Sequence, residues 1–333
     1  PAQVARSNQP MTVFSVASGA VSCTLQPIMC IRTSLLAAAF ALGACAGAPD
    51  APVTPSRPLS PVELSPGAEA NAPQRTRPLA GLVFIGGSRG GSSFARHGAR
   101  KACAAGFAAL ALPYWRAEGL PAALERIELN RFDAAIEAFG ALDFVDAGAL
   151  GVVGYSRGSE AAMLVAARND QVRALAAIAP GAVAGANIDF RDFFDNDAAW
   201  ARGGAPIDYV TVRPNRPGAN WREVMADQPP PSVARAGEVW AQLQAQPGFE
   251  AAVLPVEQIA GPVLLIGAEA DAVWASCAMG AFIAERRAGR PTSLTCVDGA
   301  AHDFMAPPQD GEDESSAAVD AWANVFAFFQ TGL

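Results

Sequence analysis

The sequence carries little basic charge and very few histidines. Acidic residues outnumber basic ones by 32 to 24, and the formal net charge is −8. This balance excludes a protein that neutralises phosphates with a basic surface, so we expect no nucleic acid partner. Only two histidines occur, His97 and His302, and chemistry that needs an imidazole must use one of them.

Signatures of nucleotide binding are also missing. The glycine-rich segment 86–91 lacks the lysine and serine pattern of a P-loop and does not read GxGxxG. No internal repeat is visible, and we expect neither a cofactor nor a metal. Half of the 333 residues are apolar, which is ample for a large core.

The first apolar run is too short to span a bilayer. It begins at Leu35, after Arg32, and ends in Leu-Gly-Ala-Cys at 42–45. This pattern looks like the lipobox of bacterial lipoproteins, so we expect residues 1–45 to be a leader and signal peptide with a lipid on Cys45. The protein would then be anchored to a membrane and periplasmic. If the run is instead a buried helix, a cytoplasmic location follows.

A proline-rich segment comes next. Residues 46–78 contain eight prolines, five of them at every third position from Pro49 to Pro61. Fixed φ angles and missing N–H groups oppose both helix and central strand. We therefore predict an extended, solvated tether over 46–78.

The remaining residues, 79–333, alternate between strand-like and helix-like segments. Continuous apolar runs suit strands that are buried on both faces of a parallel sheet. Such runs occupy 81–87, 106–113, 149–154, 172–180, 261–267 and about 292–297. The pattern predicts an α/β class with a mostly parallel, doubly wound sheet.

Two helices and one insertion complete this plan. The segment 121–142 places apolar residues on one helical face and opens with Pro121. A C-terminal helix should bury one side, formed by Val319, Trp322, Phe326 and Phe329. Residues 181–255 break the alternation, and we interpret them as a cap or lid, because ligands bind at the carboxyl ends of sheet strands.

The segment Gly154-Tyr155-Ser156-Arg157-Gly158 lies between an apolar strand and a helix. A nucleophile elbow requires this context, in which small residues allow a strained serine backbone. Ser156 is therefore the candidate nucleophile. The alternative is an ordinary glycine-rich turn.

His302 is the candidate general base. It follows the last predicted strand and precedes the C-terminal helix, where this class of sheet presents its catalytic imidazole. His97 lies in the first helix after segment 81–87, and we interpret it as having a surface or capping role.

Asp271 is the candidate acid that orients the imidazole. It follows the strand at 261–267 and gives the chain order Ser, Asp, His, which fits the α/β-hydrolase fold. Glu269, on the same loop, and Asp298, close to His302 in sequence, are the rival acids.

Backbone donors for an oxyanion should flank Ser156. One is the N–H of Arg157, at the start of the following helix. The glycine-rich segment 86–91 should supply the other, from Ser88 or Arg89.

Two cysteines should also lie near this edge of the sheet. Cys277 opens the helix after the Asp271 loop, and Cys296 ends the strand that leads to His302. A disulfide between them would suit an oxidising compartment. The alternative is that both are small buried residues.

Several motifs resemble the C-terminal catalytic domain of acyl-CoA thioesterases and bile acid-CoA:amino acid N-acyltransferases, which is dienelactone-hydrolase-like. The likeness covers most of 81–333. It rests on "AAGFAALALPYW", "LERIELNRFDAAIEAF", "LGVVGYSRGSEAAML", "LPVEQIAGPVLLIGAEADAVWAS", "GAAH" and "VDAWANVFAFF". The resemblance implies an α/β-hydrolase fold and acyl transfer through a covalent acyl-enzyme, with Ser156, Asp271 and His302 as nucleophile, acid and base.

Two departures from that family affect the expected function. Characterised members usually carry an N-terminal β-sandwich domain, whereas a proline-rich segment precedes residue 81 here. The aminoacyl-transferring branch uses cysteine as nucleophile, so the serine favours hydrolysis. We expect a serine hydrolase of a small acyl ester or thioester. The alternatives are an acyltransferase to an amine or alcohol, and a non-catalytic binding lipoprotein on a hydrolase scaffold.

Overall fold

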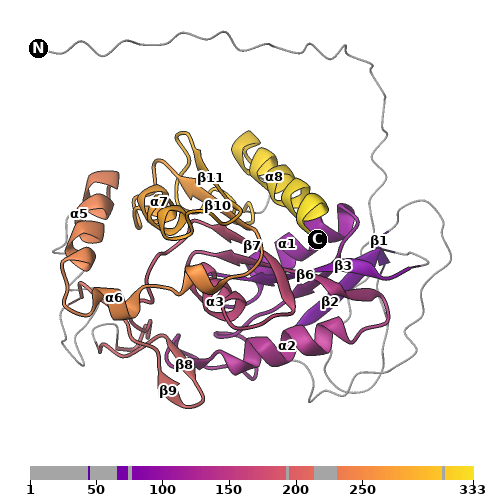
Figure 1. The fold of residues 1–333 in the computed structure, drawn as a ribbon, viewed down its shortest axis with the longest axis horizontal. Helices are drawn as coiled ribbons and strands as arrows, with labels where there is room; N and C mark the ends of the chain where they lie inside the picture. Colours follow the sequence, from indigo (N-terminus) through magenta and orange to yellow (C-terminus); the bar gives the residue numbers. More distant parts are fainter. Residues whose placement is uncertain (1–43, 46–65, 74–76, 193–194, 214–230, 310–311) are drawn as a thin grey trace, which may run out of the picture.

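The computed structural model describes residues 44–45, 66–73, 77–192, 195–213, 231–309 and 312–333. Its centre is an eight-stranded sheet in the order β1-β2-β4-β3-β6-β7-β10-β11 (Figure 1). Its strands are β1 (Ala44–Cys45), β2 (Glu69–Pro73), β3 (Leu79–Ile85), β4 (Ala108–Ala111), β6 (Val145–Tyr155), β7 (Val172–Ile178), β10 (Val263–Ala268) and β11 (Thr292–Val297). All neighbours are parallel except β2 and β4. The predicted parallel α/β sheet is confirmed.

Helices cover both faces of this sheet (Figure 1). On one face lie α1 (Ser93–Ala104) and α8 (Ser316–Gly332), and both pack into one apolar cluster. The other face carries α2 (Asn130–Gly140), α3 (Arg157–Ala166) and α7 (Ser276–Arg286), which share a second cluster. The carboxyl ends of β3, β6, β10 and β11 therefore open onto the same edge, between the two helical layers.

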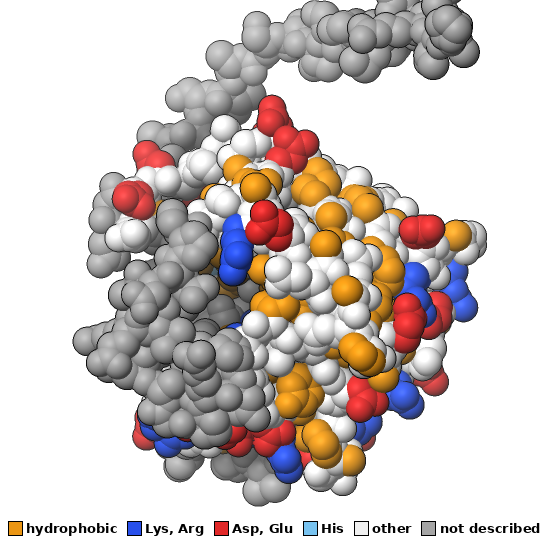
Figure 2. Space-filling model, turned by 90° about the vertical axis from the view of Figure 1, so that its left-hand side faces the viewer, with side chains coloured by type: hydrophobic (Ala, Val, Ile, Leu, Met, Phe, Trp, Pro, Cys, Tyr) orange, Lys and Arg blue, Asp and Glu red, His pale blue; other side chains and the backbone are white. Residues whose placement is uncertain are grey.

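Among the helices that the structure describes, none combines the length and the apolar character needed to cross a bilayer. Figure 2 shows the face formed by the left-hand side of Figure 1, where apolar side chains lie among scattered acidic and basic ones. The coloured part of that face is not dominated by one sign of charge.

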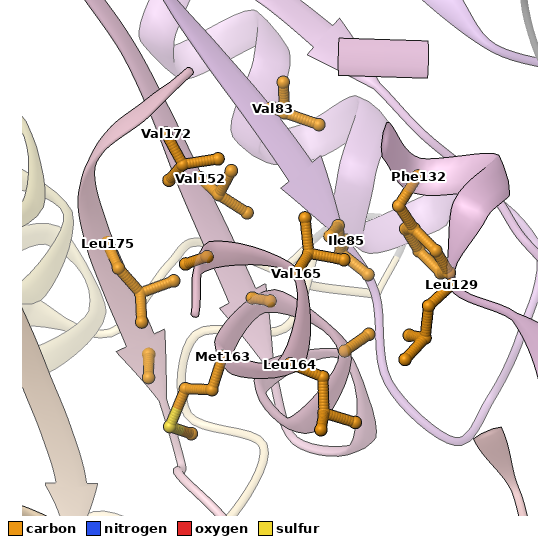
Figure 3. Packing of buried hydrophobic residues seen from close by; sticks show 14 of the residues in the cluster. Val83, Ile85, Leu129, Phe132, Val152, Met163, Leu164, Val165, Val172 and Leu175 are labelled. Carbon is orange, nitrogen blue, oxygen red and sulfur yellow. The ribbon is translucent and has the colours of Figure 1, made fainter. Parts of the chain in front are cut away.

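The core follows from strand alternation. Along β3, Leu82 and Phe84 point toward the α1/α8 layer, whereas Val83 and Ile85 point toward the α2/α3/α7 layer. All four side chains are fully buried. Figure 3 shows Val83 and Ile85 among the side chains of the second cluster, contributed by β6, β7, α2 and α3. Burial of each large apolar side chain contributes about 1.5–3 kcal/mol, so this run of residues holds β3 at the centre of the sheet.

The insertion between β7 and β10 packs along the side of the domain. Its strands β8 (Trp200–Arg202) and β9 (Ala205–Pro206) form a small sheet with β5 (Ile127–Glu128). Its helices α5 (Val233–Gln244) and α6 (Phe249–Ala252) precede a short 3₁₀ turn, η1 (Val256–Gln258). Trp240 and Phe249 make edge contacts with Phe282 of α7. Residues 193–194 and 214–230 of the predicted lid lie outside the described residues.

The helix predicted from Pro121 begins nine residues later, at Asn130. Arg126 has a φ of 44°, which interrupts a right-handed helix, and its N–H donates to the carbonyl of Ala198. Leu124 pairs with Ile188, and Ile127 belongs to β5. Both residues are buried, as the apolar pattern requires. They are buried because their backbones pair with the insertion, not because they lie on one face of a helix.

The tether predicted over 46–78 is wrong for Glu69–Pro73. This segment forms β2, pairs antiparallel with β4, and buries Glu69 and Ala70. The reason is that 67–72 contains no proline, so its N–H groups can bond to β4, and Pro73 comes only at the strand end. Residues 46–65 and 74–76 lie outside the described residues.

The buried face of α8 is rotated relative to the prediction. Ala318, Trp322, Val325 and Phe329 face the core at helical spacing, whereas the Val319 side chain is half exposed and Phe326 is only partly buried. Alanine at 318 fits close to the sheet, which allows Trp322 to reach Phe84 and Phe94.

Candidate active site

Ser156 occupies a sharp turn between β6 and α3. Its φ of 53° and ψ of −124° lie in a region that L-residues rarely adopt. Such a backbone costs about 1–3 kcal/mol and persists only where its surroundings fix it. Here the N–H of Ser156 donates to the Ile178 carbonyl (2.9 Å), and its own carbonyl accepts from Ser159 N (2.8 Å).

Close packing around this turn explains the glycine at 158. A Cβ there would collide with the carbonyl oxygens of Gly86 and Ile85 at the end of β3. A side chain at this position would therefore separate α3 from β3 and move Ser156. The small residue predicted for an elbow is required by backbone contact.

The three side chains predicted to act together form one hydrogen-bonded chain. His302 Nε2 lies 2.9 Å from Ser156 Oγ, and His302 Nδ1 lies 2.8 Å from Asp271 Oδ2. A carboxylate only accepts hydrogen bonds, so Nδ1 donates to Asp271 and Nε2 of the neutral ring accepts from the serine hydroxyl. Ser156 and Asp271 are buried, whereas His302 is partly exposed.

The environment of Asp271 stabilises its charged form. Burial opposes ionisation, but donors from His302, Ser276 and the Trp274 N–H together lower the pKa of Asp271. The rival acids Glu269 and Asp298 are both exposed, and Asp271 is the acid recorded in contact with His302 among the described residues. Of the two acidic residues on the loop after β10, Glu269 is exposed, whereas Asp271 is buried and contacts His302.

The second histidine is placed elsewhere. His97 lies on α1, 2.7 Å from Glu314, with its ring against the edge of Trp322. Burial outweighs the Glu314 contacts and lowers the pKa of His97. This position fits the predicted surface or capping role only loosely, because the ring is largely covered.

Contacts to the glycine-rich segment orient its peptide groups. Trp115 Nε1 (3.4 Å) and Gly90 N (3.1 Å) donate to the Gly87 carbonyl. Because a trans peptide is planar, the N–H of Ser88 points away from that carbonyl. Gly87 itself packs against the nucleophile turn, since a Cβ on it would lie 2.9 Å from Ser156 Cβ.

The other two oxyanion candidates differ in their surroundings. Arg157 opens α3, where the first N–H groups have no partner within the helix. The Arg89 side chain extends into solvent and lies 3.3 Å from Asp303.

A buried polar cluster beneath Ser156 was not predicted. Arg157 Nη1 bonds to Glu160 Oε1 (2.5 Å), and Arg157 Nη2 donates to the carbonyls of Gly185 (3.1 Å) and Ala186 (2.8 Å). Glu160 Oε2 accepts from Trp200 Nε1 (2.9 Å) and Gly185 N (3.1 Å). Burial raises the pKa of Glu160, and these donors oppose that rise.

This cluster, Arg157, Glu160, Gly185, Ala186 and Trp200, joins α3 to the insertion. A Cβ on Gly185 would collide with the Arg157 guanidinium. One sequence signal was available, because an Arg and a Glu three residues apart interrupt an otherwise small and apolar helix. Nothing in the sequence around Trp200 identifies it as their partner.

Two aromatic residues hold the His302 loop. Tyr155 donates its hydroxyl to the His302 carbonyl at 3.3 Å, and burial raises its pKa, so the hydroxyl remains a donor. The Trp274 ring meets the imidazole edge-on, with centroids 5.4 Å apart, and its Nε1 donates to the Ala179 carbonyl. The backbone of His302 is thus held by Tyr155 and its ring by Trp274.

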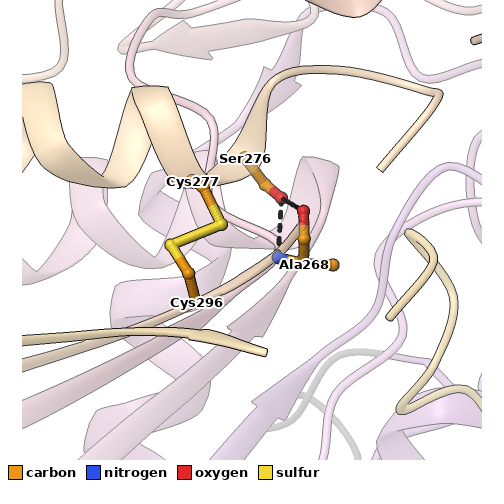
Figure 4. Close-up of a disulfide and its surroundings, with 4 residues drawn as sticks. All are labelled: Ala268, Ser276, Cys277 and Cys296. Carbon is orange, nitrogen blue, oxygen red and sulfur yellow. Dashed lines mark hydrogen bonds between the residues drawn. A yellow bond between two sulfur atoms is a disulfide. The ribbon is translucent and has the colours of Figure 1, made fainter. Parts of the chain in front are cut away.

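The structure contains the predicted disulfide between Cys277 and Cys296 (Figure 4). It links the start of α7 to the end of β11, the elements that follow and precede the Asp271 and His302 loops. Next to it, Ser276 Oγ accepts from Ala268 N at 3.1 Å. The backbone of Cys45 lies in β1, beside Pro73, and its side chain is outside the described atoms.

A cavity of about 580 Å³ opens beside the imidazole. Its walls come from the loops after β3, β10 and β11, with Tyr155 and Phe94 at its base. Within the described residues, no group of three or more His, Cys, Asp or Glu side chains is arranged to hold a metal ion.

Residues 127–309 match the family described as BAAT / Acyl-CoA thioester hydrolase C terminal. Among solved structures, a hypothetical protein from Pseudomonas aeruginosa is similar at a TM-score of 0.51 and 17% identity, covering 80% of this chain and 89% of its own. A Klebsiella pneumoniae protein assigned as a dienelactone hydrolase has a TM-score of 0.51 and 16% identity, with coverages of 79% and 92%. No curated protein matches the chain.

Proposed function

The chain belongs to the BAAT / acyl-CoA thioester hydrolase C-terminal family, and from this membership we propose that it is a serine hydrolase of esters or thioesters that works through an acyl-enzyme. The observation that carries the proposal is the continuous chain of hydrogen bonds from Ser156 through His302 to Asp271. A hydroxyl becomes a useful nucleophile when an adjacent base can accept its proton.

In the proposed first half-reaction, Ser156 Oγ attacks the acyl carbon and its proton moves to His302 Nε2. Asp271 stabilises the imidazolium that forms. The tetrahedral oxyanion accepts hydrogen bonds from the N–H groups of Arg157 and Ser88. We favour Ser88 over Arg89 because the fixed Gly87 carbonyl turns the Ser88 N–H to the opposite side of its peptide.

The first half-reaction ends when the tetrahedral intermediate collapses: the bond to the leaving group breaks, and His302 returns its proton to the departing oxygen or sulfur. In the second half-reaction, a water attacks the acyl-enzyme while His302 accepts one of its protons. This second tetrahedral intermediate then collapses, the bond between Ser156 Oγ and the acyl carbon breaks, and His302 returns the proton to Ser156 as the free acid leaves.

The test uses the two histidines of the chain as a matched pair. Ser156→Ala and His302→Gln should each lower kcat on a p-nitrophenyl acyl ester by about 10⁴-fold or more, with unfolding temperature little changed. His97→Gln removes the other imidazole, which contacts Glu314, and should retain turnover. Wild-type rates in either of the first two variants would refute the assignment.

A fluorophosphonate probe separates catalysis from binding. It should label Ser156 in the wild-type protein and not in Ser156→Ala. Absence of a wild-type adduct would favour a binding protein on a hydrolase scaffold. Product analysis with added glycine or glycerol distinguishes hydrolysis from acyl transfer, because transfer yields an amide or a new ester.

We also propose that the protein is exported and carries a lipid on Cys45. The Cys277–Cys296 disulfide supports export, because such bonds persist in oxidising compartments. In bacteria fed labelled palmitate, the wild-type protein should acquire label and Cys45→Ala should not. Equal labelling of both would refute the anchor.

A further inference from the structure

The cavity beside His302 is bounded by three loops that meet at the carboxyl edge of the sheet. The loop after β3 contributes Ser88 and Arg89, the loop after β10 contributes Val273, and the loop after β11 contributes His302 and Asp303. None of the described residues of the 181–255 insertion lines it. The cavity is therefore built from the segments that also carry the acid, the base and an oxyanion donor.

The location of the cavity beside His302 determines which part of the substrate it receives. This inference rests on the proposed function. His302 Nε2 accepts the Ser156 proton and must return it to the leaving atom, so the leaving group has to contact the imidazole. A cavity lined by His302 and Ser88 meets that requirement. The acyl chain is bonded to the same carbon in a different direction, so it leaves this cavity to the leaving group.

The geometry points to a leaving-group subsite for a neutral alcohol that carries further hydroxyls, such as glycerol or a sugar. Two residues with permanent charge line the cavity within the described part of the chain, Arg89 and Asp303, and their charges compensate each other at 3.3 Å. Buried Asp271 lies directly behind His302 and adds negative charge. The lining contributed by the described residues thus has no excess of positive charge.

A phosphorylated leaving group would require the opposite arrangement. Phosphates are bound by Arg and Lys side chains whose charge is not already compensated. The guanidinium of Arg116 donates to the Arg89 carbonyl and stacks on Phe190 at 4.8 Å, and Arg116 does not line the cavity. The charge distribution therefore disfavours coenzyme A as the leaving group.

The Arg89–Asp303 pair is well suited to hydroxyl groups. Its side chains are 84% and 54% exposed, and a pair so exposed contributes little to stability. A guanidinium offers only donors and a carboxylate only acceptors, so one hydroxyl can accept from Arg89 and donate to Asp303 at once. Ser88 and Ser93 add two hydroxyls to the same wall, and Val273 offers apolar contact.

The experiment compares substrates that share one acyl group. Glyceryl monobutyrate, 6-O-butyryl glucose, ethyl butyrate and butyryl-CoA differ only in the leaving group, and p-nitrophenyl butyrate reports general activity. We expect kcat/KM for the glyceryl or glucosyl ester to exceed that for ethyl butyrate and for butyryl-CoA by about tenfold, the value of one hydrogen bond to a charged group. The ratio of kcat/KM for glyceryl monobutyrate to that for 6-O-butyryl glucose shows whether glycerol or a sugar is the better leaving group.

Charge variants provide the decisive readout. Asp303→Asn leaves Arg89 uncompensated, so it should raise relative kcat/KM for butyryl-CoA while lowering it for the hydroxylated ester about tenfold. Arg89→Gln should lower kcat/KM both for butyryl-CoA and for the hydroxylated ester. A merely structural role for the pair would change all substrates in the same proportion. Arg235→Gln, which removes an exposed pair with Glu238 on α5, is the matched control and should leave every ratio unchanged.

The outcomes separate this inference from the proposed function. Turnover of p-nitrophenyl butyrate together with a preference for butyryl-CoA overturns the inference and leaves the serine hydrolase intact. Equal kcat/KM for the ethyl, glyceryl and glucosyl esters also overturns it. No turnover of any substrate, with no labelling of Ser156, overturns both.

Discussion

Replacement of Glu160 by glutamine should destabilise the protein far more than a change of one atom suggests. Glu160 is almost fully buried and accepts hydrogen bonds from Arg157, Trp200 and Gly185 N. Glutamine keeps one carbonyl oxygen and the side-chain shape, but it removes the charge that compensates Arg157. Arg157, a residue only 8% exposed, then remains charged without this counter-ion.

The magnitude follows from the cost of leaving a buried charge unpaired. Breaking a buried ion pair by removing one partner costs about 3–5 kcal/mol. For a domain of this size that loss corresponds to a fall in Tm of roughly 10 °C. The amide of glutamine adds to the penalty, because its NH₂ group faces donors where the carboxylate offered acceptors.

Urea unfolding and thermal unfolding of Glu160→Gln measure the effect. Glu137→Gln is the matched control, because Glu137 is exposed on α2 and its change should cost less than about 0.5 kcal/mol. A double-mutant cycle with Arg157→Gln isolates the pair, and we expect a coupling energy of about 1–3 kcal/mol. If Glu160→Gln destabilises no more than Glu137→Gln, or if the cycle is additive, the ion pair does not stabilise the fold as argued.

Three further predictions concern the neighbourhood of the elbow. Gly87→Ala places a Cβ 2.9 Å from Ser156 Cβ, so it should lower single-turnover rates by about 10²-fold while the fold survives, and an unchanged rate would contradict the packing argument. The double variant Cys277→Ser/Cys296→Ser should lose about 3 kcal/mol of unfolding free energy without reductant, since the bond closes a loop with a sequence separation of 19. The lowered pKa of Asp271 means that its carboxylate stabilises the fold above its ordinary pKa of 3.8 and loses this effect as pH falls through the lower folded value. The Tm difference between wild type and Asp271→Asn should therefore be large at pH 6 and shrink below pH 3.8, and a constant difference would refute the linkage.

The central strands of the sheet were predictable because they are buried on both faces. Such strands read as unbroken apolar runs, and β3, β7 and β10 lie within two residues of where those runs predict them. The order of Ser156, Asp271 and His302 along the chain likewise allowed us to predict that these three residues lie together. A parallel sheet brings the carboxyl ends of its strands to one edge, so residues far apart in sequence meet there.

Prediction failed where long-range pairing decides local structure. The segment from Pro121 has helical apolar spacing, yet hydrogen bonds to the insertion hold Leu124 and Ile127 in extended conformations. Likewise, the absence of proline from 67–72 permits β2, but the strand forms because β4 offers it an edge, which the local sequence does not reveal. In both cases the deciding hydrogen-bond partner lies far away in the chain.

The polar cluster of Arg157, Glu160 and Trp200 shows how the insertion is tied to the turn at Ser156. Arg157 directly follows Ser156, and its side chain bonds to the carbonyls of Gly185 and Ala186 at the start of the insertion. Movement of the insertion would therefore act on the residue whose N–H we propose as an oxyanion donor. The leaving-group cavity, in contrast, is formed by the loops after β3, β10 and β11. Changes in the insertion should consequently alter acyl selectivity together with rate, whereas changes at Arg89 and Asp303 should alter selectivity among leaving groups.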